Sequence, residues 1–185
     1  MFPHYIGRGV ALHDENLTQL AQYIKLIVEV EAPIHESEVT RRLMDGYGVS
    51  RAGNRIIINI QSAIRKGGAD KLFHYHQQFL YLDHQKLSQI RNRSAFTSAD
   101  RNIEYVAPEE IDMAVLEIVR LGFSMPRSIA ISEVLSALGF GRSTEKISAV
   151  VNHQIDSLLS RHHLALDGEQ LTISTKHGSD ETRQP

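Results

Sequence analysis

Hydrophobic positions in the first half of the chain recur at helical spacing in three stretches and then alternate. The first stretch covers residues 17–31 and ends before Pro33, which cannot continue a helix. Ser37 is a suitable N-cap for a second amphipathic stretch, and Ser50 for a third. Residues 71–82 then alternate as two short strands joined by a turn. The pattern predicts three helices followed by a β-hairpin.

The same order of signals returns in the second half at an offset of 91 residues. The loop Gly48–Arg51 matches Gly139–Arg142, and the stripe of the third helix matches too, with Ile56, Ile60 and Ile64 falling on Ile147, Val151 and Ile155. The triplet Ser37–Val39 recurs as Ser132–Val134, four residues out of register. That slip predicts a longer connection before the second copy's middle helix, which would begin at Ser132. The second hairpin, at 164–173, has Asp-Gly at its turn.

Three short helices followed by a hairpin is the order of a winged helix. We therefore expect an α+β, mostly helical chain built from tandem winged-helix-like repeats, since two copies are too few for a solenoid. The expected boundaries are an N-terminal segment at 1–16, a first domain at 17–83, a basic linker at 84–107, a second domain at 108–174 and a disordered tail at 175–185.

Several runs of residues, taken together, carry a resemblance to a known family; they are Ile27–His35, Arg41–Leu43, Gly48–Ile56, Phe79–Tyr81, Arg91–Arg93, Ile103–Ile111 and Leu138–Arg142. The chain resembles, over residues 17–174, the C-terminal domain of unassigned function found at the end of large bacterial superfamily-one DNA helicase-related proteins. There this domain follows a helicase core and a restriction-endonuclease-like domain. The family usually has Gly where Ala32 stands and an apolar residue, often Trp, where Tyr81 stands. The resemblance implies an accessory module of a DNA helicase or nuclease.

Composition and motifs narrow the function classes. Hydrophobic residues make up 42% and charged residues 23% of the chain, enough for a buried core, and the net charge of −2 excludes a uniformly basic coat protein. The chain has no Cys, no apolar run of membrane-spanning length and no secretory signal at its start, so we expect a cytoplasmic protein. It also lacks a phosphate-binding loop and an Asp…Glu-x-Lys nuclease motif. We expect no enzymatic activity and no cofactor.

The strongest functional candidates lie at the start of the third helix. Residues 36–66 carry a local charge of +3, and Arg51, Asn54 and Arg55 stand on that helix's first turn, away from its apolar stripe. Arginine and asparagine are suited to guanine, adenine and phosphate contacts. Arg91 and Arg93, with Lys86 before them, are further candidates for phosphate contacts from the linker. A charged face that is merely solvated stays open as the alternative at both places.

Other interpretations also stay open. The second copy carries fewer positive charges and is expected to pack against the first copy or a protein partner. The whole chain could serve as a docking or oligomerisation module without DNA binding, or as a small dimeric transcription regulator. His74 and His76 share a strand face, but nothing completes a set of three or four metal ligands, so no metal site is predicted.

Overall fold

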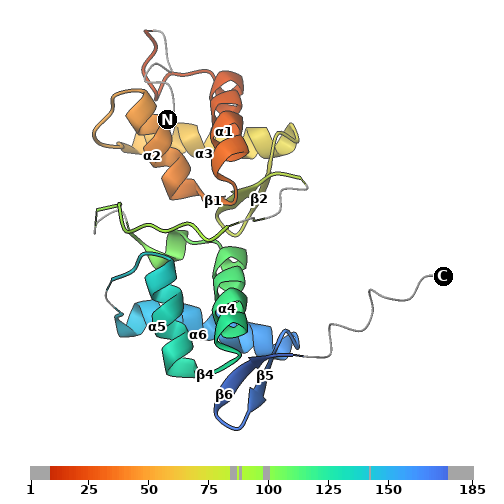
Figure 1. Cartoon of the computed structure of the whole chain (residues 1–185). Helices are drawn as coiled ribbons and strands as arrows, with labels where there is room; N and C mark the ends of the chain where they lie inside the picture. The colour runs from red at the N-terminus through yellow and green to blue at the C-terminus, as the bar shows by residue number, and fades with distance from the viewer. Residues whose placement is uncertain (1–8, 84–86, 88, 98–100, 142, 175–185) are drawn as a thin grey trace, which may run out of the picture. The chain divides into compact units, whose positions relative to one another are not determined.

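The computed structural model describes residues 9–83, 87, 89–97, 101–141 and 143–174, which form two compact units, one within Met1–Lys86 and one within Leu87–Pro185 (Figure 1). Within these residues the fold is α+β, with six α-helices and two three-stranded antiparallel sheets. No described helix is long and apolar enough to cross a membrane. The predicted tail at 175–185 lies outside the described residues, as do Lys86 and Arg142.

Unit 1 follows the predicted order of elements and adds one strand. Its elements are α1 (Leu17–Glu31), β1 (Ile34–His35), α2 (Glu36–Gly46), α3 (Asn54–Ala69), β2 (His74–His76) and β3 (Phe79–Tyr81). The added strand β1 pairs with β3, which gives the sheet order β1-β3-β2. Asn16 caps α1 by accepting a hydrogen bond from the backbone of Thr18 at 2.8 Å. The buried side chains are those of the periodic stripes, among them Leu20, Ile24, Val39, Leu43, Ile60 and Ile64.

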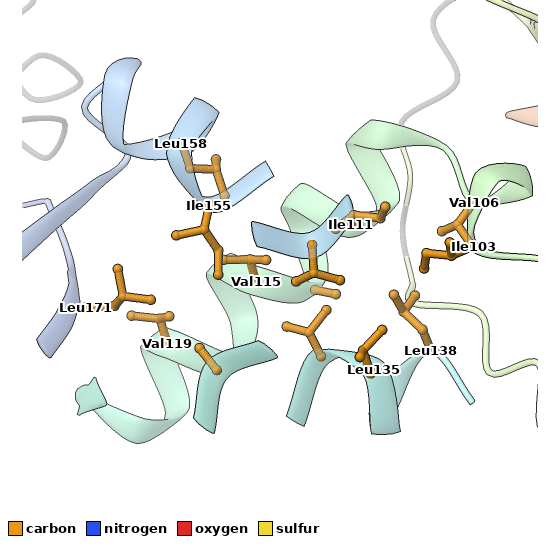
Figure 2. Packing of buried hydrophobic residues seen from close by; sticks show 14 of the residues in the cluster. Ile103, Val106, Ile111, Val115, Val119, Leu135, Leu138, Ile155, Leu158 and Leu171 are labelled. Atoms are coloured by element: carbon orange, nitrogen blue, oxygen red, sulfur yellow. The ribbon is translucent and has the colours of Figure 1, made fainter. Parts of the chain in front are cut away.

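Unit 2 has the same order of elements after an added 3-10 helix. The elements are η1 (Ile103–Tyr105), α4 (Pro108–Gly122), β4 (Ser124–Pro126), α5 (Arg127–Ala137), α6 (Glu145–Ser160), β5 (Leu164–Asp167) and β6 (Gln170–Ile173), with sheet order β4-β6-β5. Figure 2 shows its core, where Val115 and Val119 of α4 face Ile155 of α6 and Leu171 of β6.

The two units repeat one another at the predicted offset, without the predicted slip. Helices α4, α5 and α6 each begin and end 91 residues after α1, α2 and α3, and the pair Met125–Leu171 repeats the pair Ile34–Leu80. The expected start of the second middle helix at Ser132 is wrong, because α5 begins at Arg127. A shift of four residues is about one helical turn, so it preserves the buried face and mimics a true register match.

Part of the segment expected as a linker belongs to the core of unit 2. Ile103, Val106 and Ala107 are buried, and Leu12, in the expected N-terminal segment, is equally buried in unit 1. Leu12 stands 91 residues before Ile103, so the repeat extends beyond the first helix of each unit. Helical spacing of hydrophobic positions could not reveal these residues, because single apolar residues in short turns show no periodicity.

Candidate nucleic-acid interface

The start of α3 is an open helix end. The N-cap is Gly53, not the predicted Ser50, and it provides no side chain to accept from the first backbone N–H groups. The first turn holds no acidic residue. Because unpaired N–H groups and the helix dipole favour negative charge, this end of α3 presents a positive potential.

Three of the predicted contact residues meet at this end. Arg51, Asn54 and Arg55 are all exposed. The Arg55 guanidinium donates to the Asp14 carboxylate at 3.0 Å, yet its side chain stays 76% exposed. No described residue forms a hydrogen bond or ion pair with the side chains of Arg51 and Asn54. Since an exposed ion pair contributes little, all three side chains can turn toward a ligand.

Beyond the first turn, the exposed side of α3 again carries positive charge and no acidic residue. Ile56, Ile60 and Ile64 are buried against the rest of unit 1, which directs the opposite side of the helix to solvent. The helix contains no acidic residue from end to end. Arg65, near its end, is exposed and donates to the Ser62 hydroxyl at 3.1 Å.

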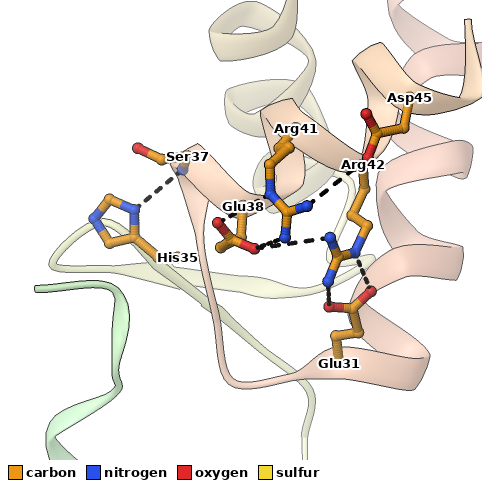
Figure 3. A network of polar contacts seen from close by, with 7 residues as sticks. All are labelled: Glu31, His35, Ser37, Glu38, Arg41, Arg42 and Asp45. Atoms are coloured by element: carbon orange, nitrogen blue, oxygen red, sulfur yellow. Dashed lines mark hydrogen bonds and ion pairs between the residues drawn. The ribbon is translucent and has the colours of Figure 1, made fainter. Parts of the chain in front are cut away.

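The arginines of α2 are neutralised within unit 1 (Figure 3). Arg42 donates to both oxygens of Glu31, at 2.6 and 2.8 Å. Arg41 donates to Glu38 at 2.6 Å and lies 3.9 Å from Asp45. Within residues 36–66, the stretch with a local charge of +3, these bidentate and helix-spaced pairs occupy Glu38 and Asp45, which are most of the acidic residues there. The positive charge available to a ligand is therefore concentrated at α3.

Arg91 and Arg93 are engaged in a buried ion cluster, at a distance along the chain from α3. Both guanidinium groups donate to the fully buried carboxylate of Glu110 on α4, at 2.6 to 3.1 Å, and the backbone N–H of Arg91 donates to it as well, at 2.9 Å. Burial alone would raise the pKa of Glu110, but the hydrogen bonds and charges of Arg93 and Arg91 outweigh it and hold the pKa below its usual range. A phosphate would have to compete with this carboxylate.

The backbone around these arginines packs closely on unit 2. The N–H of Arg93 donates to the Leu138 carbonyl at 3.0 Å, and the Asn92 amide donates to the Ala137 carbonyl at 3.1 Å. Gly139 has φ of +86°, and a Cβ there would lie 2.4 Å from the Ser94 nitrogen. Only glycine satisfies both constraints at this contact.

The start of α6 in unit 2 differs from that of α3. Thr144 caps it by accepting from the Ile147 N–H at 3.3 Å, and Glu145 places a negative charge in its first turn. Lys146 forms an ion pair with Glu104 at 2.8 Å. The two repeats thus share a fold, while the open cationic helix end is confined to unit 1 among the described residues.

The histidines His35 and His74 both have side-chain partners within unit 1. His35 is buried and caps α2: Nδ1 accepts from the Ser37 N–H, and Nε2 lies 3.1 Å from the Gln78 amide oxygen. Its position directly before Glu36, at the start of α2, was the available signal. His74 is paired with Asp83, and the described residues contain no group of three or more His, Asp or Glu able to hold a metal ion.

Comparison with known proteins gives one match. Residues 10–57 match a family described as "Protein of unknown function (DUF3320)". The matched segment spans α1, β1, α2 and the first turn of α3, including Arg51, Asn54 and Arg55. No curated protein and no solved structure matches the chain.

Proposed function

We propose that this chain is a non-catalytic DNA-binding module of the cytoplasm, built from two winged-helix-like units, of which the first makes the DNA contact. The order of three helices and a three-stranded sheet, with β1 inserted between α1 and α2, supports this assignment. In such a unit the third helix enters the major groove of duplex DNA. That helix is α3 in unit 1.

The observation that carries the proposal is the open N-terminal end of α3, with Arg51, Asn54 and Arg55 exposed around it and no acidic residue along the helix. Arg51 and Arg55 would hold phosphates, and Asn54 would face the base edges. Arg91 and Arg93 would have to release Glu110 before contacting DNA. We therefore base the interface on α3 and keep the two linker arginines as auxiliary contacts.

A DNA helicase or nuclease core is the proposed partner of the module. This part rests on the resemblance of residues 17–174 to the C-terminal domain of helicase-related proteins. The matched family has no assigned function, so the partner is a proposal in its own right.

Fluorescence anisotropy with labelled duplex and single-stranded DNA, across a salt series, tests the function. We expect micromolar or tighter binding that weakens steeply as salt rises. Replacing Arg51 and Arg55 together with Ala should reduce the slope of log K against log salt by about two units. The matched control replaces Arg120 and Lys146, two exposed cations of unit 2, and should leave the slope unchanged. An unchanged slope in the α3 variant would exclude these arginines as phosphate contacts.

A protein-docking role is the second candidate, and exposed apolar side chains of unit 2 favour it. Phe123 is 86% exposed, Leu121 71% and Leu166 58%, and Leu121 and Phe123 lie two residues apart where α4 ends. Analytical ultracentrifugation of the wild-type chain and of the Phe123→Ser variant separates the two candidate functions. A wild-type dimer that is replaced by a monomer in the variant, together with no DNA binding at low salt, would favour docking over the DNA proposal.

A further inference from the structure

One apolar side chain stands among the polar groups on the exposed side of α3. Ile58 is 61% exposed, one helical turn after Asn54, while its neighbours Ile56 and Ile60 are buried. Ile58 therefore contributes little to the core of unit 1. Among the described residues of α3 it is the only large hydrophobic side chain that is exposed to this degree.

We propose that Asn54 and Ile58 make α3 a reader of A·T pairs in duplex DNA, an inference that rests on the proposed DNA-binding function. The Asn54 amide can donate to adenine N7 and accept from its N6 amino group. The Ile58 side chain can pack on the C5-methyl group of thymine, which is the apolar feature of the major groove. Both contacts select the same type of base pair.

The spacing of the two residues fits base pairs about two steps apart. Four residues of helix rise about 6 Å, and successive base pairs are about 3.4 Å apart, so the two side chains would reach positions about two steps apart. Arg55 lies directly beside Asn54 in the first turn, and Arg65 follows Ile58 by about 10 Å along the helix axis. Cations at both ends would hold the phosphates while the residues between them face the bases.

Charge favours DNA over a protein as the occupant of this side of α3. A protein-docking helix usually presents several apolar anchors in a row, at spacings of three and four residues. Here Ile58 is a single apolar group, and the exposed residues around it are Asn54, Arg55, Gln61 and Arg65. The positive charges with no acidic residue on the helix complement a polyanion.

Three duplexes of the same length, measured by anisotropy at one salt concentration, test the inference. The first contains A·T pairs, the second is identical except that deoxyuridine replaces every thymidine, and the third contains G·C pairs. Replacing thymine by uracil removes only the methyl group. We expect the wild-type chain to bind the thymine duplex about fourfold more tightly than the uracil duplex for each methyl contacted.

Two variants assign the preference to its residues. Ile58→Ala should bind the thymine and uracil duplexes with equal affinity. Asn54→Ala should show a smaller preference for A·T over G·C than the wild-type chain and should keep its preference for thymine over uracil, which comes from Ile58. Leu26→Ala removes a half-exposed apolar side chain from α1 and should keep both preferences. Because Ile58 and Asn54 are exposed, both variants should fold.

The outcomes separate this inference from the function on which it rests. Equal wild-type affinity for the A·T and G·C duplexes, when the separate salt series shows steep salt dependence, would overturn the reading of A·T pairs and leave the DNA-binding function intact. Equal wild-type affinity for the thymine and uracil duplexes would overturn the methyl contact of Ile58. Absence of binding to all three duplexes at low salt would overturn both. An Ile58→Ala variant that keeps the thymine preference would overturn the assignment to Ile58.

Discussion

Replacing Glu110 with Gln should destabilise unit 2 by about 3 kcal/mol. The Glu110 carboxylate is fully buried and accepts five hydrogen bonds from Arg91 and Arg93. Removing one partner of a buried ion pair typically costs about 3–5 kcal/mol, because the remaining charge is left uncompensated. Arg91 is 31% exposed and can recover some hydration, so the lower end of that range applies. Arg93, at 11% exposure, cannot.

The effect should also depend on pH in a defined direction. The pKa of Glu110 is lower in the folded chain than its usual value, so the cluster stabilises unit 2 at pH above the unfolded pKa of about 4.3. That contribution is lost as pH falls through the folded pKa. The difference in unfolding free energy between wild type and Glu110→Gln should therefore be largest near neutral pH and shrink in acid.

Urea denaturation followed by pulsed hydrogen exchange in peptides from α4 measures unit 2 separately from unit 1. Glu117→Gln is the matched control: it makes the same chemical change at an exposed position of the same helix, and it should alter stability by less than about 0.5 kcal/mol. The reasoning would be refuted if Glu110→Gln behaved like Glu117→Gln at neutral pH, or if the difference between the two grew on acidification.

Two further predictions follow from backbone and side-chain geometry. Gly139→Ala should destabilise unit 2 by more than the ~1 kcal/mol expected for Gly48→Ala in unit 1, since both have positive φ but only at Gly139 would the new Cβ meet Ser94; urea unfolding of both variants checks this, and equal losses would contradict it. Burial and the hydrogen bond to Glu36 raise the pKa of Tyr75 to about 12, so its contribution to stability is lost as pH rises through that value. A tyrosinate absorbance titration of Tyr75→Phe should lack one late step, and a curve with the wild-type number of late-ionising tyrosines would contradict the assignment.

Local periodicity was enough to predict the helices and their buried faces. The stripe Ile56, Ile60 and Ile64 is buried as expected, and its counterpart Ile147, Val151 and Ile155 lies at the same offset in α6. Periodicity could not choose between registers one turn apart, because a helix presents the same face every four residues. This ambiguity produced the wrong start for α5.

Contacts between segments far apart in the chain could not be read from local pattern. Arg91 and Arg93 look like free cations in a polar stretch, and their partner Glu110 is 17 to 19 residues away. The signal that existed was the position of Glu110, one turn before the buried Ala114, where a lone carboxylate requires a partner. The exposed start of α3, in contrast, could be predicted, because its exposure follows from the stripe on the opposite side of the helix.

Mapping the DNA contact on the folded chain tests the role of α3 most directly. A ¹⁵N-labelled chain is titrated with a short duplex, and backbone amide shifts are followed residue by residue. We predict that the largest shifts cluster within residues 51–65, at the start and along the exposed side of α3. Shifts concentrated around Leu121 and Phe123 of unit 2, or no shifts at low salt, would contradict DNA binding through α3.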